Sequence, residues 1–544
     1  MFSVPARTSR LRALEFSADR IALVILAVIA LIAGITFRDY GLGWDDFSQS
    51  QYGELLLKFY GSGFADRRAL SFVNLYKYGG AFDMAAALAA KLLPFGLFET
   101  RRLIGAAVGI LGLIVTWRIG RRLSGPLAGL CALALLAACP LYYGHMFINS
   151  KDAPFAVAMA VLLLGFVRAI DEYPRASAWT MVLTGVGIGL AFGSRILALL
   201  AGPYLLAALV LLFTEEARSD GFGAAAKRLG RFMRSMLPAL LIGYLIMGLL
   251  WPWSIISPLN PIRAAIYFDK FFETPWRELY EGKLIQVPNM PATYLPHLFA
   301  LKLPLLMLIL ALAGAVGALI VCLRRRLPAP QRAKLLMISV AALLPIATAM
   351  VTRPALYNGI RQFVFVVPPF AVLGGLAAAW ALAQAQRHSR LAFGAAAAVL
   401  LAGLALPIAG MARLHPYEYV YFNTLAGNVR GAHGNYMLDY WGLAFKQAAD
   451  ALRAYVATAH EKPGRRWVVA ICGPQSAAEA ELGPKFETTF DTKKADFVMS
   501  LGTFYCRHLQ APLLAEIKRE GISFARVYDL RGRPTPKLLT QPPP

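Results

Sequence analysis

Long apolar runs alternate with short polar segments through the first three quarters of the chain. A helix that crosses the hydrocarbon core of a bilayer needs about 20 residues, and eleven runs approach or reach this length. They are residues 20–37, 102–118, 125–143, 153–169, 177–193, 196–213, 235–252, 299–323, 335–351, 363–384 and 391–411. The pattern predicts an α-helical polytopic membrane protein of about eleven transmembrane helices. An odd number of spans places the two ends of the chain on opposite sides.

Two polar segments between these runs are long enough to form loops of their own, at residues 38–100 and 253–298. The first contains "FDMAAALAAKLLPFGLF", an amphipathic stretch that favours a helix lying along the membrane surface. The second has too many prolines and charges to cross the bilayer. Both loops are predicted to face the same side as the C-terminus.

From about residue 412 the pattern becomes that of a soluble domain. "GLAFKQAADALRAYVATA" has helical periodicity, "RWVVAI", "ADFVMSL" and "ISFARVYDL" are β-rich, and "LLAEIKRE" is predicted as a helix. We therefore expect two parts, a transmembrane domain at 1–411 and a small α/β domain at 412–544 that ends in a flexible tail. Gly185, Gly189 and Gly193 form a ladder of small residues that predicts close packing of helices.

Composition supports the membrane assignment, since 58% of the residues are hydrophobic and 16% are charged. The net charge of +24 would suggest a nucleic-acid partner in a soluble chain. Here the arginines and lysines cluster between alternate apolar runs, as in cytoplasmic loops. This places the N-terminus in the cytoplasm and the C-terminal domain outside, where Cys472 and Cys506 could pair in an oxidising compartment.

Three acids lie in the outward-facing loops. Asp45 and Asp46 are adjacent in "GWDDF", and Asp152 lies in "NSKDAPF". Neighbouring side chains in a helix or strand point in different directions. One acid of the pair is therefore expected to act in a cavity while the other caps a helix, binds a cation or faces water. Asp152 stands before Pro154 and is a natural N-cap for the next span.

Cations also occur at the outer ends of the predicted spans, where the distribution of positive charge would disfavour them. They are Lys151, Arg195, Lys302, Arg353 and Arg361. Each alone could extend to lipid headgroups, but several of them beside acids suggest a bound phosphate. His145 and His297 stand alone in different loops, and a packing role fits either better than metal ligation.

Acids and cations together predict a reaction. A carboxylate can accept a proton from a hydroxyl group and make it a nucleophile, while arginine or lysine neutralises a departing phosphate. A sugar linked through phosphate to a membrane lipid suits both groups. Displacement in one step, with the base and the leaving phosphate on opposite faces of the sugar carbon, would invert its configuration.

Several segments in this order resemble one known group of proteins. They are the acid pair, "NSKDAPF", "RPALYNGIRQFVFVVPP", "HPYEYVYFNTLAG" and "DYWG". Together they resemble bacterial members of the glycosyltransferase 39 group, which are polyprenyl-phosphate-sugar-dependent transferases of the GT-C superfamily. This group is related to protein O-mannosyltransferases and to the lipid A aminoarabinose transferase. The resemblance covers roughly residues 20–445.

The resemblance implies a GT-C fold, a multi-pass protein of the bacterial inner membrane, and transfer on the periplasmic face. Asp45 corresponds to the base, Asp46 to its neighbour, and Asp152 to a second acid that orients the acceptor or assists the base. The remaining site residues are expected to be Lys151, Arg361 and Arg195 for the donor phosphate, and His145, Asn149 and Tyr357 for substrate. No cofactor is expected, and a divalent metal is possible but not expected. "DYWG" differs in residue order from the WWDYG signature of oligosaccharyltransferases.

The expected partners are a polyprenyl-phosphate-linked sugar and a hydroxyl acceptor on a lipid, glycan or protein, with no nucleic acid. Two other classes of protein remain open. A transporter or flippase also places charges near a membrane cavity, although no internal repeat is evident here. A noncatalytic scaffold that presents the C-terminal domain would leave the clustered acids and cations without a role.

Overall fold

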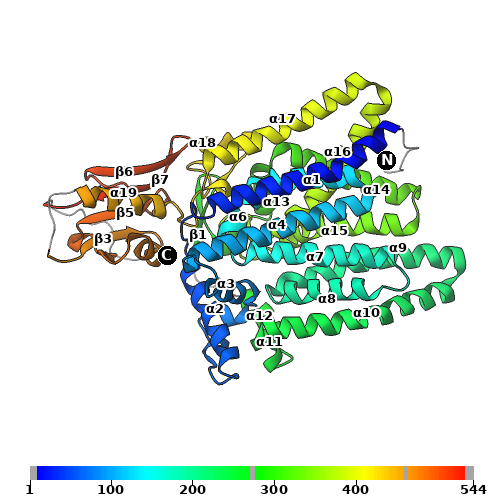
Figure 1. The fold of residues 1–544 in the computed structure, drawn as a ribbon, viewed down its shortest axis with the longest axis horizontal. Helices are drawn as coiled ribbons and strands as arrows, with labels where there is room; N and C mark the ends of the chain where they lie inside the picture. Colours follow the sequence, from blue (N-terminus) through cyan, green and yellow to red (C-terminus); the bar gives the residue numbers. More distant parts are fainter. Residues whose placement is uncertain (1–8, 270–275, 459–463, 533–544) are drawn as a thin grey trace.

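The computed structural model describes residues 9–269, 276–458 and 464–532. Its helices form an elongated bundle, and a small β-sheet with two helices packs against one end of the bundle (Figure 1). The long helices are α1 (Ser9–Thr36), α4 (Leu97–Ser124), α7 (Asp152–Asp171), α9 (Ala201–Asp220), α10 (Phe222–Leu250), α14 (Leu305–Arg324), α15 (Ala329–Thr352), α16 (Val367–His388) and α17 (Arg390–Leu414). Three shorter helices complete the bundle, α5 (Pro126–Ala137), α6 (Pro140–Ile148) and α8 (Ala178–Phe192).

All eleven predicted runs are helical. Within the described residues, nine helices are long and apolar enough to cross a membrane, and α5 with α6 would make a tenth, bent by 65°. The eleventh run is α8, which has 15 residues and is shorter than the length expected of a span. The prediction of a polytopic helical membrane protein is confirmed.

Two helices form the centre of the bundle. In the apolar windows of α7 and of η5–α16 (Arg361–His388), 83% and 94% of the residues are buried, against 6% in α17. Helices at the edge leave their apolar side chains free for lipid, whereas α7 and α16 are surrounded by protein. Asp152 is the first residue of α7 and Arg361 begins η5 (Arg361–Val366), so both central helices start at residues that the sequence marked as functional.

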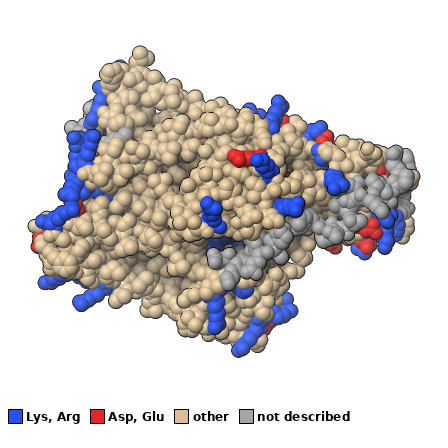
Figure 2. Space-filling view, turned by 180° about the vertical axis from the view of Figure 1, so that it is seen from behind, with Lys and Arg blue, Asp and Glu red and all other residues tan. Residues whose placement is uncertain are grey.

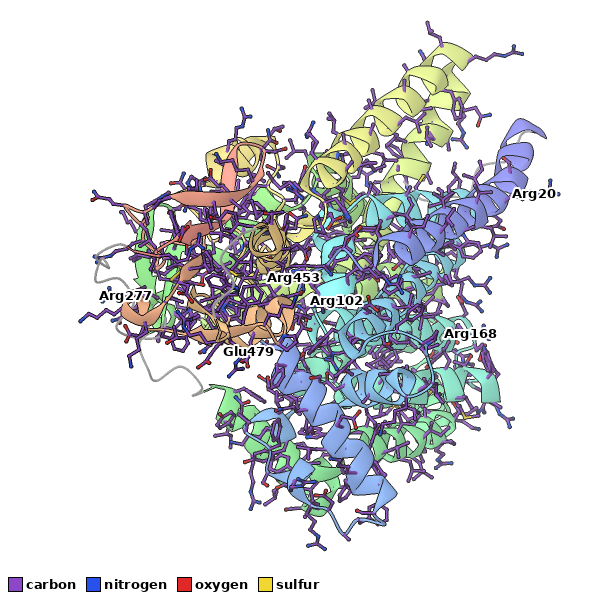
Figure 3. All side chains as sticks on the ribbon, turned by 60° about the vertical axis from the view of Figure 1, so that its left-hand side comes forward. Arg20, Arg102, Arg168, Arg277, Arg453 and Glu479 are labelled. Carbon is purple, nitrogen blue, oxygen red and sulfur yellow. A yellow bond between two sulfur atoms is a disulfide. The ribbon has the colours of Figure 1, made fainter. Side chains whose placement is uncertain are left out.

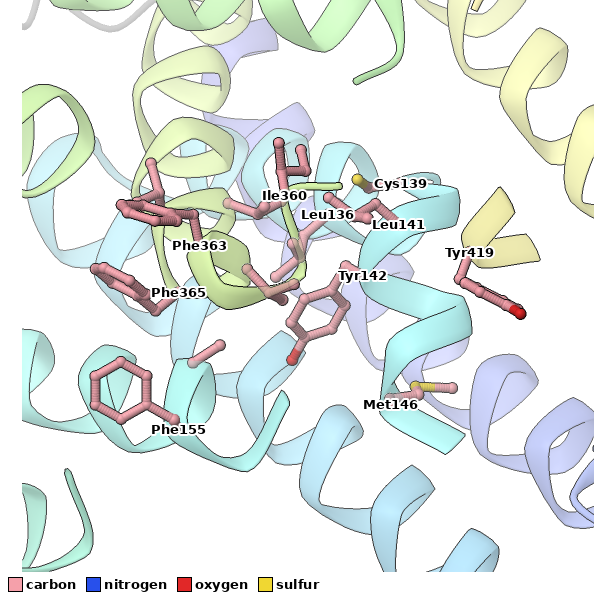
Figure 4. Packing of buried hydrophobic residues seen from close by; sticks show 14 of the residues in the cluster. Leu136, Cys139, Leu141, Tyr142, Met146, Phe155, Ile360, Phe363, Phe365 and Tyr419 are labelled. Atoms are coloured by element: carbon pink, nitrogen blue, oxygen red, sulfur yellow. The ribbon is translucent and has the colours of Figure 1, made fainter. Parts of the chain in front are cut away.

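Aromatic packing holds the starts of these two helices together (Figure 4). The rings of Phe155 and Phe365 meet edge to face with centroids 5.2 Å apart. The Tyr142 hydroxyl donates a hydrogen bond of 2.8 Å to the carbonyl of Gly109. Because close-packed interiors resist displacement, polar groups at the adjacent helix ends have fixed positions.

The predicted glycine ladder is confirmed in the contact between α8 and α10. A Cβ atom at Gly185 would lie 2.7 Å from Cβ of Ile242, and one at Gly193 would lie 2.9 Å from Cβ of Leu250. The two backbones approach so closely that larger side chains would force them apart.

Short elements form the loops at the end of the bundle that carries the sheet. They are α2 (Asp46–Gly61), η1 (Arg68–Leu70), η2 (Leu75–Lys77), α3 (Ala81–Ala90), α11 (Pro252–Ile256), α12 (Asn260–Asp269), β1 (Arg277–Tyr280), β2 (Lys283–Gln286), η4 (Val287–Asn289), α13 (Tyr294–Lys302), η6 (Glu418–Val420), η7 (Thr424–Ala426) and α18 (Asn428–Ala432); η3 (Ile196–Leu200) precedes α9. The described residues of the 253–298 loop form only short helices and the β1–β2 hairpin, as expected of a segment that does not span.

The C-terminal region contains a five-stranded sheet in the order β4-β3-β5-β7-β6. Its elements are α19 (Phe445–Thr458), β3 (Trp467–Cys472), α20 (Gln475–Leu482), β4 (Phe486–Thr489), η8 (Thr492–Lys494), β5 (Phe497–Leu501), β6 (Leu513–Arg519) and β7 (Ile522–Asp529). β3 pairs in parallel with β4 and β5, whereas β7 runs antiparallel to β5 and β6. α17 ends at Leu414, close to the expected boundary at 411.

One predicted element of this region is wrong. "LLAEIKRE" forms strand β6, not a helix, and pairs with β7. Glu520 and Gly521 connect the strands with φ values of 49° and 82°, the left-handed conformations that a two-residue hairpin turn requires. The hairpin and its neighbour in the sheet outweigh the helical propensity of Leu, Ala, Glu and Lys.

Cys472 and Cys506 form a disulfide, as the sequence suggested. It joins the end of β3 to the segment that follows β5. The predicted tail from about residue 531 lies mostly outside the described residues.

Candidate functional site

The two adjacent acids of the first outer loop have different environments. Asp46 is buried, and its carboxylate accepts hydrogen bonds of 2.9 and 2.7 Å from the guanidinium of Arg102 on α4 and one of 2.8 Å from the amide of Gly43. Arg102 lies near the junction of the helical bundle and the C-terminal sheet (Figure 3). Although the sequence placed Asp46 in the catalytic set, its geometry is that of an anchor that holds the loop to α4.

Asp45 precedes the first turn of α2 and is partly exposed. Within the described part of the chain, no hydrogen bond or ion pair engages its carboxylate. It interacts electrostatically with Lys151 and Arg361. A carboxylate that is free of direct partners and close to cations can accept a proton or meet a substrate group.

Asp152 is held by cations from two other segments. Its carboxylate forms ion pairs with Arg195 at 2.5 Å and Arg361 at 3.2 Å, and it accepts a 2.8 Å hydrogen bond from the Asn149 side chain. The prediction that Asp152 caps α7 is wrong, because Asp152 is the first helical residue and its carboxylate is turned to the arginines. The Asn149 side chain instead accepts from the amides of Lys151 and Asp152.

Lys151 completes a group of three cations. Its ammonium lies 4.6 Å from the ring centroid of Tyr78, and the same ring contacts the guanidinium of Arg195 at 5.7 Å. Burial lowers the pKa of Lys151, while the charge of Asp45 acts in the opposite direction. We call Lys151, Arg195 and Arg361 the cation cluster.

Two other cations from the sequence prediction are not part of this cluster. The Lys302 ammonium lies over the ring of Phe422 at 4.2 Å, and burial lowers its pKa to about 7. Arg353 is exposed. All five cations occupy similar sequence positions, at the ends of apolar runs, but three of them converge.

The three residues expected to bind substrate lie around the cation cluster. His145 is completely buried, between the Tyr440 hydroxyl at 3.1 Å and the Asn149 amide at 3.2 Å. Asn149 is therefore the link between His145 and Asp152. Tyr357 faces the cluster directly, with its ring centroid 4.9 Å from the Arg361 guanidinium.

Several residues of this site were not singled out from the sequence. Arg102 anchors Asp46, and Tyr78 supports two cations. The signal for Arg102 was present, because a charged residue at the start of an apolar run needs a partner. Tyr78 gives no such signal, since a tyrosine near a membrane surface is common.

The acids do not offer an obvious metal site. Asp46 and Asp152 are engaged by arginines, which leaves one open carboxylate. In residues 9–269, 276–458 and 464–532, no group of three or more His, Cys, Asp or Glu side chains converges as metal ligands would.

Comparison with known proteins agrees with this architecture. Residues 81–223, which include Lys151, Asp152 and Arg195, match the family model of dolichyl-phosphate-mannose-protein mannosyltransferases. No curated protein matches the chain significantly by sequence.

Three solved structures have a similar fold. ArnT from Cupriavidus metallidurans in the apo state is 16% identical, with 94% of this chain and 98% of that chain covered and a TM-score of 0.51. The same protein bound to undecaprenyl phosphate is 15% identical, with 94% and 97% covered and a TM-score of 0.50. The apo oligosaccharyltransferase from Archaeoglobus fulgidus is 12% identical, with 89% and 70% covered and a TM-score of 0.50.

The chain has the fold of a polytopic membrane protein of the GT-C fold class, and the predicted fold class is confirmed. Within this class the chain is similar to the protein O-mannosyltransferases and to ArnT. This confirms the family resemblance seen in the sequence.

Proposed function

We propose that this protein is a membrane glycosyltransferase that moves a sugar from a polyprenyl-phosphate donor to a hydroxyl acceptor. The main support is one arrangement, an open Asp45 carboxylate beside the cation cluster at the starts of the two central helices. The family match to mannosyltransferases and the solved structure of the similar ArnT with undecaprenyl phosphate support the class of donor.

The cation cluster suits a lipid-linked phosphate. Arg195 and Arg361 are oriented by Asp152, so their guanidinium groups are arranged before a substrate binds. Among the described residues, nothing accepts a hydrogen bond from the buried Nε of either arginine. Preorganised donors of this kind stabilise the charge that develops on a leaving phosphate, and charge-assisted hydrogen bonds from arginine to phosphate are strong.

Asp45 would act as the base. It would accept the proton of the acceptor hydroxyl as the oxygen attacks the sugar carbon. The bond from this carbon to the phosphate oxygen breaks in the same step, and the electron pair leaves with the phosphate. Because attack and departure occur on opposite faces, the configuration of the sugar carbon inverts.

The distribution of charge supports a periplasmic site in a bacterial inner membrane. On the face shown in Figure 2, Lys and Arg gather at the end of the bundle opposite the sheet, and a broad, almost uncharged band separates them from the rest. By the positive-inside rule that end would be cytoplasmic. The disulfide Cys472–Cys506 then lies on the oxidising side, together with Asp45 and the cation cluster.

We also propose that the reaction needs no divalent metal. Asp46 is neutralised by Arg102, and Asp152 by two arginines. One remaining carboxylate is a poor ligand set for a hard divalent cation, which prefers several oxygens. Activity should therefore persist after treatment with EDTA, and a loss that Mg²⁺ or Mn²⁺ restores would contradict this part of the proposal.

The test is the release of polyprenyl phosphate from a panel of polyprenyl-phosphate sugars, in membranes that contain the protein and its native acceptor. Asp45→Asn should slow release by about 100- to 10,000-fold, the usual contribution of a general base. Asp152→Asn should also lose activity because the arginines lose their counter-charge. The control is Asp66→Asn, which changes an outer-loop acid paired with Arg68 and should leave activity unchanged.

Full activity in both Asp45→Asn and Asp152→Asn would overturn the proposed mechanism. Movement of the intact sugar lipid across the membrane without release of polyprenyl phosphate would instead identify a flippase.

A further inference from the structure

The "DYWG" segment, residues 439–442, forms a turn that projects from the C-terminal region into the candidate site. Asp439 is buried, and its carboxylate accepts hydrogen bonds of 3.1, 3.0 and 3.0 Å from the amides of Gly442, Leu443 and Ala444. The Tyr419 hydroxyl donates to the same carboxylate. Gly442 has a φ of 83°, which favours glycine. The side chain of Asp439 thus defines the shape of the turn.

The first outer loop is shaped to receive this turn. A Cβ atom at Gly43 would collide with the indole of Trp441, and one at Gly41 would collide with the carbonyl of Leu443. Both glycines belong to "YGLGWDD", which carries Asp45. This segment, residues 40–46, which we call the acid loop, therefore packs in direct backbone contact with the turn.

The two aromatic residues of the turn reach two parts of the site. The Tyr440 hydroxyl lies 3.1 Å from Nε2 of His145, and Asn149 connects His145 to Asp152. The Trp441 ring lies 4.8 Å from the Arg361 guanidinium, and Tyr357 contacts the same guanidinium at 4.9 Å. Arg361 is therefore held by two aromatic rings and by the carboxylate of Asp152.

Trp441 also has an unused polar group. The residue is 4% exposed, and in the part of the chain that the structure describes no group accepts a hydrogen bond from its buried indole Nε1. Buried indole N–H groups normally have partners. Nε1 instead lies against the backbone of Gly43, where an added Cβ atom would be 2.2 Å from it. The ring is therefore fixed between the loop that carries Asp45 and the Arg361 guanidinium.

We propose that Trp441, which lies in the region beyond the last span, is a positioning residue of the active site. It holds the Arg361 guanidinium in place for the phosphate of the donor. The identity of the ligand rests on the proposed function, whereas the effect on Arg361 does not. The C-terminal region would then be part of the active site in addition to any role in recruiting acceptors.

The test compares Trp441→Leu with Trp441→Phe in the full-length protein. The leucine variant loses the aromatic face, and the phenylalanine variant keeps it. Trp467→Leu is the matched control. Trp467 begins β3, is also buried, and has its ring centroid 5.5 Å from the guanidinium of Arg531, which follows β7.

The first readout is the reaction of Arg361 with phenylglyoxal, followed by peptide mass spectrometry without any substrate. Arg361 is buried in the native protein, so it should react slowly in the native protein, in Trp441→Phe and in Trp467→Leu. It should react several-fold faster in Trp441→Leu. Equal rates in all four proteins would overturn the proposal.

The second readout is the binding of undecaprenyl phosphate. We expect Trp441→Leu to weaken binding about tenfold, which is within the range of a desolvated cation–π contact. The KM for the donor should rise with little change in kcat, and Trp441→Phe should recover most of the affinity. Unchanged affinity in Trp441→Leu would overturn the proposal.

The two readouts separate this inference from the proposed function. The native protein could fail to bind undecaprenyl phosphate while Arg361 still reacts faster with phenylglyoxal in Trp441→Leu. In that case the proposed donor is wrong and the positioning role stands. Trp441→Leu could instead lower the midpoint of thermal unfolding more than Trp467→Leu does, without making Arg361 selectively reactive. That result would show that the role of Trp441 is purely structural.

Discussion

Two groups of charged residues lie close together at the same end of the bundle, and they are organised differently. Beneath the first outer loop, buried arginines and acids are matched one to one, Arg102 with Asp46 and Arg101 with Asp83. Close to this group, the direct ion pairs that the cation cluster makes within residues 9–269, 276–458 and 464–532 all go to Asp152, and the open Asp45 carboxylate lies near Lys151 and Arg361. The first group is neutral by itself, and the second group has an excess of positive charge.

The difference separates charges that maintain the fold from charges that could bind a ligand. A buried matched pair is costly to break, since the remaining partner is left without compensation. A buried cluster with more cations than acids becomes neutral when an anion binds. The excess of positive charge marks the second group as the functional one. Asp45 and Asp46 belong to different groups although they are neighbours in the sequence.

The largest expected effect concerns the matched group. Asp46→Asn leaves Arg102 buried without its partner, and such a change costs about 3–5 kcal/mol of stability. The midpoint of thermal unfolding in detergent should therefore fall strongly. Asp45→Asn should stay within about 0.5 kcal/mol of the native protein, as for sites without such contacts.

Equal midpoints for the two asparagine variants would remove the distinction between the acids. The double variant Asp46→Asn/Arg102→Met sharpens the test. If the loss in the single variant comes from an unpaired charge, the double variant should recover part of the stability.

The next effect concerns the unmatched group. Arg361→Gln removes a charged hydrogen-bond donor, which is worth about 1.5–3 kcal/mol, so undecaprenyl phosphate should bind roughly 10- to 100-fold more weakly. Arg353→Gln is the control, because Arg353 is exposed at the end of another helix. Similar affinities in the two variants, measured by titration, would contradict a phosphate site at the cluster.

The sequence predicted the bundle well because the bilayer leaves few alternatives. In lipid, every backbone group of a span must form its hydrogen bond within its own helix, so a long apolar run is enough to identify a transmembrane helix. The sheet was predicted less well, since the strand β6 depends on its pairing with β7. No local pattern in "LLAEIKRE" reveals that partner.

The sequence selected residues that the structure brings together, but it did not reveal their different environments. Asp45, Lys151, Asp152 and Arg361 were chosen because they are charged residues on one side of the membrane. Which of the adjacent acids is open depends on Arg102, which is distant in sequence and pairs with Asp46. The absence of Lys302 and Arg353 from the cluster likewise follows from helix packing and not from any local feature.

A smaller effect is expected from the titration of Lys151. Burial places its pKa below the usual 10.5, and the charged form is the one that binds phosphate. The affinity for undecaprenyl phosphate should therefore fall as the pH rises above neutrality toward 10, by up to about tenfold for loss of one charged contact. Lys151→Arg should make the affinity nearly independent of pH in this range, because arginine stays protonated.

A steep fall in affinity in the Lys151→Arg variant would show that another group titrates. An affinity independent of pH in the native protein would show that Lys151 does not contact the phosphate.

The smallest effect concerns a third charged group, in which one histidine serves two acids. His415 contacts Glu418 through Nδ1 at 2.7 Å and Asp39 through Nε2 at 2.9 Å. Burial lowers the pKa of His415, but the hydrogen bonds and charges of Glu418 and Asp39 outweigh it, so the pKa is raised above 6.5. Only the protonated ring can donate to both carboxylates.

Because the folded pKa is the higher one, this contribution to stability is complete below pH 6.5 and is lost as the pH rises through the folded pKa. The pair is partly exposed, so we expect about 1 kcal/mol or less. The difference between unfolding midpoints at pH 5.5 and pH 8.5 should be smaller in His415→Gln than in the native protein, whereas His433→Gln, at an exposed histidine, should leave it unchanged. If His415→Gln also leaves the difference unchanged, the histidine does not act as a shared partner.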